Sequence, residues 1–140
     1  MTRVALLLVL LSTSPALADP LSICEGGHRA ERKLTCIVDG DTGWEHGVKW
    51  RLLGSTGGVD APELSKPECP AEKRQAIAAR DRLRELMGAG YSFIPSGNPD
   101  RYGRMLAQIQ LADGRDAGDV LMSEGLAQPW PNRGNKWCER

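Results

Sequence analysis

Apolar residues recur at two different spacings along this chain, and the spacing separates the expected strands from the expected helices. Short alternating or continuous apolar stretches predict strands at 33–38, 42–45, 48–53, 91–95 and 105–111. His46-Gly47 is expected to form the turn of a hairpin between the second and third of these. Glycine, serine and proline between other stretches predict loops at 54–58 and 96–100.

Two segments show a helical spacing instead. Pro70 suits the first position of a long helix, which we expect to end at Gly88. Its apolar face consists of residues three or four positions apart: Ala76, Ala79, Leu83, Leu86 and Met87. Asp116 is expected to cap a short second helix that continues to Met122. Five short strands, one long central helix and a short second helix predict a mainly β, α+β fold, organised as a small Greek-key barrel.

The N-terminus has the three-part pattern of a secretory signal peptide. Arg3 gives a positive start, 4–11 is an unbroken apolar run, and Ala16-Leu17-Ala18 is a small-residue cleavage signal. We therefore predict a signal peptide at 1–18, a secreted or periplasmic protein that begins at Asp19, and no membrane anchor after cleavage. The alternative interpretation is a buried N-terminal helix.

Export changes the interpretation of the four cysteines. Cys24, Cys36, Cys69 and Cys138 form no Cys-x-x-Cys pair, so a zinc site is disfavoured. An even number in an oxidising compartment indicates two disulfides, for which three connectivities are possible. We favour Cys24–Cys36, because it is local, and Cys69–Cys138, which would tie the C-terminal tail to the domain.

The overall charge of the chain gives no support for nucleic-acid binding. The chain has 140 residues, which predicts one domain, and 18 Lys and Arg balance 18 Asp and Glu. A protein that coats a polyanion is normally strongly basic. An aromatic content of 5% also argues against an extended base-stacking platform. A local basic site remains compatible with this composition.

Four carboxylates fall at expected strand ends or in loops. They are Asp39, Asp41, Asp60 and Glu63. Such side chains beside a rigid strand can converge on a hard cation, which prefers several oxygen ligands. Taken alone, Asp39-Gly40-Asp41 is more typical of a simple turn.

Two arginines are candidates for binding phosphate. Arg51 lies in an apolar strand and Arg104 in a loop that leads into another strand. A pair of guanidinium groups can clamp a phosphate, although each residue alone is more typical of a structural or solvated charge. His28 and His46 have no partners at the spacing of a catalytic triad.

Taken together, these segments resemble the staphylococcal (micrococcal) nuclease, or thermonuclease, family. The matching stretches are Val38-Asp39-Gly40-Asp41-Thr42, Arg51-Leu52-Leu53-Gly54, Val59-Asp60-Ala61-Pro62-Glu63, Asp100-Arg101-Tyr102-Gly103-Arg104 and Glu124-Gly125-Leu126-Ala127. The resemblance implies an OB-fold five-stranded barrel at 33–128, an N-terminal extension at 19–32 and a disulfide-tied tail at 129–140. It also implies hydrolysis of phosphodiester bonds in DNA and RNA with calcium, by a protein that we expect to be a monomer.

The resemblance further implies roles for individual residues. Asp41, Asp60 and the carbonyl of Ala61 are similar to the calcium ligands, and Glu63 to the residue that activates the attacking water. The residues similar to those that bind phosphate and substrate are Arg51, Arg104, Arg101 and Tyr102.

One departure from the family pattern lies within the expected site. The family arginine and second aspartate are usually five positions apart, whereas Arg51 and Asp60 are nine apart. Ser55-Thr56-Gly57-Gly58 resembles a four-residue insertion between them. It can bulge outward at little cost, or it can displace Asp60 and Glu63 from a productive geometry.

Three hypotheses follow. The leading one is an exported, calcium-dependent nuclease without strong sequence specificity. The alternative is a catalytically impaired OB-fold module that binds nucleic acid or oligosaccharide. A third is a disulfide-stapled scaffold that contacts a protein partner through its tail.

Overall fold

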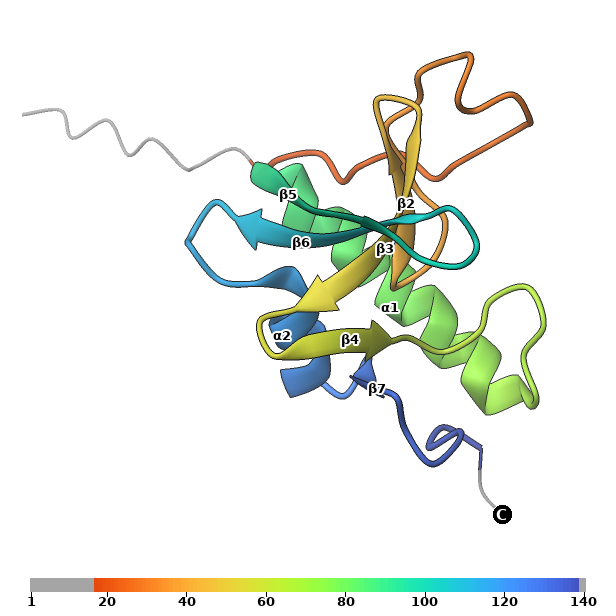
Figure 1. Ribbon diagram of the computed structural model, residues 1–140. Coiled ribbons are helices and arrows are strands. Elements are labelled where there is room, and N and C mark those ends of the chain that lie inside the picture. Colours follow the sequence, from red (N-terminus) through yellow and green to blue (C-terminus); the bar gives the residue numbers. More distant parts are fainter. Residues whose placement is uncertain (1–16, 139–140) are drawn as a thin grey trace, which may run out of the picture.

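The computed structural model describes residues 17–138, and it arranges them as one sheet with two helices (Figure 1). The predicted signal peptide at 1–18 falls almost wholly outside the described residues, so it stays a prediction. Within 17–138, neither helix has an apolar stretch long enough to cross a membrane.

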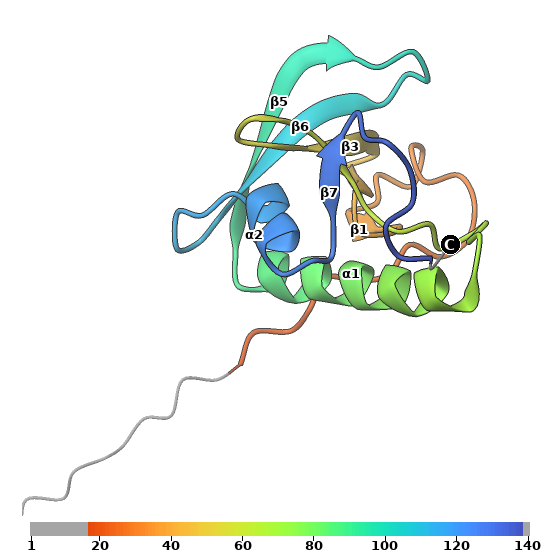
Figure 2. The same cartoon turned by 90° about the horizontal axis from the view of Figure 1, so that it is seen from below.

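Both helices form where the apolar spacing predicts them. Helix α1 spans Pro70–Gly88 and α2 spans Ala117–Ser123. Asp116 caps α2 as expected, because its side chain accepts a hydrogen bond from the Asp119 N–H. The cap of α1 was not predicted: it is Cys69, whose sulfur accepts from the Glu72 N–H at 3.4 Å. Figure 2 shows α1 running along one side of the sheet.

Seven strands form the sheet. They are β1 (Cys36–Ile37), β2 (Thr42–Glu45), β3 (Val48–Gly54), β4 (Gly57–Asp60), β5 (Tyr91–Pro99), β6 (Met105–Leu111) and β7 (Gln128–Trp130). Their order is β1-β2-β3-β4-β7, with β6 added to β3 and β5 added to β6. The β3–β6 pair is parallel, and the other pairs are antiparallel. Strand β3 is therefore the centre of the sheet, with three neighbours.

Several expectations about the strands are wrong. The predicted loop at 54–58 is the tip of a hairpin, because β3 ends at Gly54 and β4 begins at Gly57. The predicted loop at 96–100 mostly belongs to β5, which continues past an irregularity to Pro99. The sheet has seven strands rather than the expected five, because β4 and β7 add further pairs, and the expected five-stranded barrel is not confirmed.

The core lies between the sheet and the helices. Trp50 and Leu52 of β3 are fully buried against Leu83 of α1 and Leu121 of α2. Phe93 packs on Trp50 with ring centroids 6.4 Å apart. These contacts fix β3, so the residues on its other face have a rigid base.

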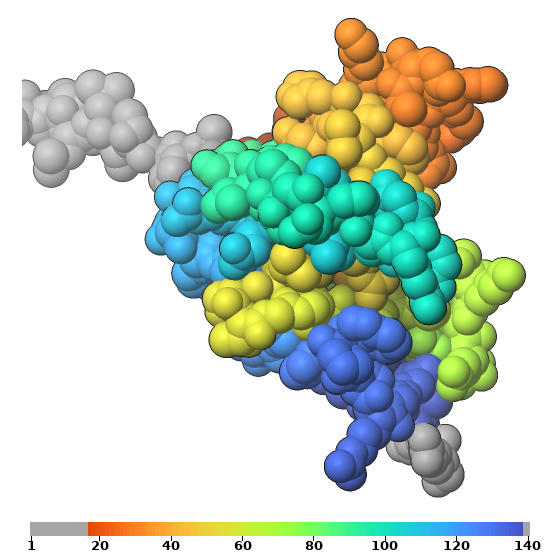
Figure 3. Space-filling view, viewed as in Figure 1, coloured from red at the N-terminus to blue at the C-terminus, as the bar shows by residue number. Residues whose placement is uncertain are grey.

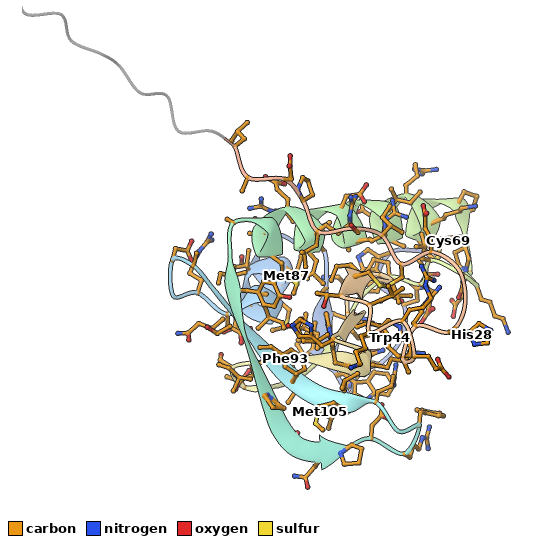
Figure 4. All side chains as sticks on the ribbon, turned by 90° about the horizontal axis from the view of Figure 1, so that it is seen from above. His28, Trp44, Cys69, Met87, Phe93 and Met105 are labelled. Atoms are coloured by element: carbon orange, nitrogen blue, oxygen red, sulfur yellow. A yellow bond between two sulfur atoms is a disulfide. The ribbon has the colours of Figure 1, made fainter. Side chains whose placement is uncertain are left out.

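Two disulfides tie the N-terminal segment to β1 and the C-terminal tail to the start of α1. Cys24 pairs with Cys36 and Cys69 pairs with Cys138, which is the connectivity favoured from the sequence. Cys69 lies at the beginning of α1, far from Met87 near the other end of the helix (Figure 4). The tail is thus tied to the first turn of α1.

Candidate active site

The inserted residues lie at the tip of the β3–β4 hairpin. Gly54 pairs with Gly57 and Leu53 with Gly58, so Ser55 and Thr56 form the turn and Gly57 and Gly58 begin β4. At Arg51, the two edges of β3 are occupied by Thr42 of β2 and Leu106 of β6, so β4 is not its partner in the sheet. Arg51 and Asp60 nevertheless stay close, with Arg51 Nη2 3.6 Å from Asp60 Oδ1.

The hairpin tip is anchored rather than free. Ser55 donates from its backbone N–H to the Asp119 carboxylate at 2.9 Å, and its hydroxyl donates to the other oxygen of the same group. Gly118 lets α2 approach closely, since a Cβ there would lie 3.0 Å from the Cα of Gly54. Helix α2 therefore holds the insertion outside the site.

Arg51 lies at the centre of the carboxylates. Its Nη2 is 3.1 Å from Asp41 Oδ2 and 3.6 Å from Asp60 Oδ1, and it donates to the Val59 carbonyl at 3.1 Å. One guanidinium group thus connects β3, β4 and the turn that precedes β2. This geometry brings together three residues that the sequence assigned to one site.

Asp41 is the most buried of these carboxylates, with 3% of its surface exposed. The Thr42 hydroxyl donates to its Oδ1 at 2.9 Å, and the Ala61 N–H donates to its Oδ2 at 2.8 Å. Burial, with a further contribution from the charge of Asp39, raises the pKa of Asp41 to about 7 although Arg51 opposes the shift. The raised pKa means that burial disfavours the charged form of Asp41. Additional positive charge nearby would stabilise that charged form.

The Asp39-Gly40-Asp41 segment is both a turn and part of the site. The Asp41 N–H donates to Asp39 Oδ1 at 3.1 Å, as in an Asx turn. A Cβ on Gly40 would lie 2.8 Å from the Cβ atoms of Ala61 and Ala79, so only glycine fits between the β4 exit and α1. The turn holds Asp41 beside Ala61.

Glu63 is fixed through its backbone by a residue that the sequence analysis missed. The buried side chain of Glu72 in α1 accepts from the N–H groups of Glu63 at 2.9 Å and Glu68 at 2.6 Å. Burial, followed by the charge of Asp41, raises the pKa of Glu63. A Cys-x-x-Glu spacing before a helix is a variant of the capping box, and it is the signal that points to Glu72.

Arg104, Arg101 and Tyr102 form a second group. Tyr102 is exposed, and the guanidinium carbons of Arg101 and Arg104 lie 4.9 Å and 5.4 Å from its ring centroid. Arg104 donates to Asp100 at 2.7 Å. Trp50 pairs with Met105, so Arg104 precedes β6 on the face of the sheet that also carries Arg51.

A comparison with known families places the chain in one of them. A model of the family described as staphylococcal nuclease homologue matches residues 55–136, more than half of the chain. The chain belongs to this family. The matched range includes Asp60, Glu63 and Arg104. It begins after Asp41 and Arg51, which lie close to one another and to Asp60. No curated protein matches the chain.

A staphylococcal nuclease homologue belongs to a family that generally depends on a metal, and the donors of this member suit a hard cation. Carboxylate oxygens of Asp41 and Asp60 and the carbonyl oxygen of Ala61 are the ligand types that such ions prefer. Within residues 17–138, no three His, Cys, Asp or Glu side chains lie close enough to hold a metal by themselves. The carbonyl and water would have to complete the shell.

Proposed function

We propose that this protein is a calcium-dependent nuclease that hydrolyses phosphodiester bonds of DNA and RNA without strong sequence specificity. The observation that carries the proposal is the position of Arg51 within 3.1 Å of Asp41 and 3.6 Å of Asp60. These residues meet across the inserted hairpin, and Glu63 follows Asp60 by three positions.

Each residue has a distinct role in this proposal. Asp41, Asp60 and the Ala61 carbonyl would hold the calcium ion, which supplies positive charge near the scissile phosphate. Arg51 and Arg104 would bind phosphate oxygens and stabilise the negative charge that develops in the transition state. Glu63 would take the proton of the attacking water.

Arg101 and Tyr102 would contact substrate beyond the scissile phosphate. Tyr102 is 68% exposed and lies near two guanidinium groups, which together form a charged and aromatic surface for a nucleotide. Contacts of this kind read the phosphate backbone and base faces rather than base edges, and therefore support cleavage without strong sequence preference.

We propose further that the protein acts outside the cytoplasm, in the periplasm or as a secreted protein. Two observations support this location: the signal-peptide pattern at 1–18 and the pairing of all four cysteines in disulfides. Disulfides of this type persist in oxidising compartments.

The test is cleavage of single-stranded DNA by the oxidised protein, with calcium and with a chelator. We expect cleavage with calcium only, and a loss of at least about 100-fold in kcat for Glu63→Gln, because the general base is removed. Glu68→Gln is the matched control, since it neutralises an exposed glutamate on the same loop and should retain activity.

The same experiment separates the nuclease from the binding module. A folded, calcium-loaded protein that binds an oligonucleotide without cleaving it would contradict the nuclease proposal. Binding that is unaffected by Glu63→Gln would then support the OB-fold binding module.

A further inference from the structure

Two amide groups of the C-terminal tail converge on one oxygen of Asp60. Gln128 Nε2 donates to Asp60 Oδ2 at 3.0 Å, and Asn132 Nδ2 donates to the same oxygen at 2.7 Å. The other oxygen, Oδ1, faces Arg51. The Asp60 carboxylate therefore has one oxygen used by the tail and one directed into the site.

Strand β7 places Gln128 at this position. It pairs antiparallel with β4 in a register that sets Gln128 directly opposite Asp60. The Gln128 side chain is buried, and it also donates to the Gly134 carbonyl at 3.1 Å. The residues added to β4 by the insertion, Gly57 and Gly58, include the partner of Trp130 in this ladder. The insertion and the tail thus form one structural unit.

The orientation of the Asn132 amide is fixed as well. Its Oδ1 accepts from the Gly134 N–H at 2.9 Å, which leaves Nδ2 to point toward Asp60. Further along the tail, Lys136 donates to the Ala127 carbonyl at 3.1 Å, and the Cys138 disulfide holds the end against α1. Figure 3 shows the tail, in blue, against the β3–β4 hairpin, in yellow.

The tail also makes one wall of a cavity beside the carboxylates. The cavity has a volume of about 220 Å³, and its lining includes Asp60, Glu63, Asn132 and Trp137. This space is large enough for several water molecules. The tail therefore borders the region in which hydrated ligands would reach Asp60.

We propose that Gln128 and Asn132 are positioning residues that hold the Asp60 carboxylate in the orientation required for metal binding. The inference rests on the proposed calcium site, and it adds a function for the tail. Hydrogen bonds from a second layer of residues orient carboxylate ligands and strengthen metal sites. Two donors on one oxygen restrict rotation of the carboxylate and present Oδ1 to the cation.

The test compares Asn132→Leu and Gln128→Met, singly and together, with the unmodified protein. Both substitutions keep the approximate side-chain size and remove the amide donor. Gln110→Met is the matched control, because Gln110 is an exposed amide on β6. Circular dichroism and thermal unfolding establish that each variant folds. If Gln128→Met does not fold, the test is made with Asn132→Leu alone.

The readouts are the calcium dissociation constant by titration calorimetry and the calcium dependence of DNA cleavage. We expect the dissociation constant to rise by about 10- to 100-fold in the double variant and to stay unchanged in Gln110→Met. The KM for DNA at saturating calcium should be unchanged, because the phosphate-binding arginines are intact.

Two results would overturn the inference: unchanged calcium affinity in a folded double variant, or no calcium binding by the unmodified protein. A protein that binds calcium but cleaves nothing would contradict the proposed nuclease activity alone. Weaker calcium binding by the variants would still support the positioning role in that case.

Discussion

At the scale of single residues, the site depends on a few groups that each make several contacts. Arg51 is near two carboxylates and donates to one carbonyl, and Glu72 accepts from two backbone N–H groups. Glu72 is 2% exposed, so its charge is stabilised mainly by these donors. The residue links the first turn of α1 to the loop that carries Glu63.

We expect Glu72→Gln to lower the free energy of unfolding by about 1 to 3 kcal/mol at pH 7, because glutamine cannot accept from both N–H groups equally well. Burial raises the pKa of Glu72, but hydrogen bonds from Glu63, Glu68 and Asn135 outweigh it and hold the pKa below the ordinary 4.5. A carboxyl with a lowered folded-state pKa stabilises fully above pH 4.5, and this stabilisation is lost as the pH falls through the folded value.

Urea unfolding at a series of pH values checks this expectation. The difference between the unmodified protein and Glu72→Gln should be constant above about pH 5.5 and shrink below pH 4.5. A difference that grows as the pH falls would contradict the assignment. Glu85→Gln is the control, since Glu85 pairs with Arg82 on the exposed side of α1 and should change stability by less than about 1 kcal/mol.

The sequence predicted the site residues that lie in short motifs, and it missed those that depend on tertiary contacts. Asp41, Asp60 and Arg51 were identified from local patterns and are neighbours in the structure. Gln128 and Asn132 were not identified, because an amide is an ordinary tail residue until the pairing of β7 with β4 brings it to a carboxylate.

At the scale of elements, the β3–β4 hairpin and β7 are the features that the sequence described least well. Glycine and serine at 54–58 are typical of a loop, and β-propensity alone gives no reason to expect a strand there. The strand β4 forms because it has partners on both edges, β3 and β7. The helices are easier to predict from the sequence, since their apolar spacing and caps are local signals.

We expect Gly58→Ala to separate β7 from β4. A Cβ at this position would lie 2.9 Å from the Trp130 carbonyl oxygen and 3.2 Å from the Trp130 Cβ, and the backbone must move to admit it. The free energy of unfolding should fall by about 1 to 3 kcal/mol, with faster hydrogen exchange confined to the β4–β7 ladder. Gly27→Ala is the control, since a Cβ there has no neighbour within 4 Å. Unchanged exchange in the ladder would show that the tail tolerates a side chain here.

At the scale of the whole molecule, two disulfides close loops of very different size. Cys24–Cys36 has a sequence separation of 12 and Cys69–Cys138 one of 69. The longer loop contains α1, β5, β6, α2 and β7, so this bond restricts half of the chain in the unfolded state. The disulfide connectivity was favoured from the sequence, whereas the seven-stranded sheet could be recognised only from the structure.

We expect the double variant Cys69→Ser, Cys138→Ser to unfold with a free energy about 4 kcal/mol lower, against about 3 kcal/mol for Cys24→Ser, Cys36→Ser. Serine at 69 retains an acceptor at the N-cap of α1, so the comparison reports mainly on the lost bond. Guanidinium unfolding of the two variants measures the difference. A larger loss in the free energy of unfolding for Cys24→Ser, Cys36→Ser would contradict the expectation that loop entropy determines the contribution of each disulfide.

The hairpin of β3 and β4 also determines how this part of the chain can change in length. Neighbouring cross-strand pairs alternate between hydrogen-bonded and non-hydrogen-bonded pairs. A given two-residue turn connects the strands next to only one of these two kinds of pair. A hairpin that keeps both its turn and its register therefore grows by two residues in each strand. The four residues Ser55-Thr56-Gly57-Gly58 equal one such increment in length, although they themselves lie in the turn and in β4. We expect homologous hairpins to differ by multiples of four residues, and peptides engineered into this tip to leave the candidate active site undisturbed when they obey the same count.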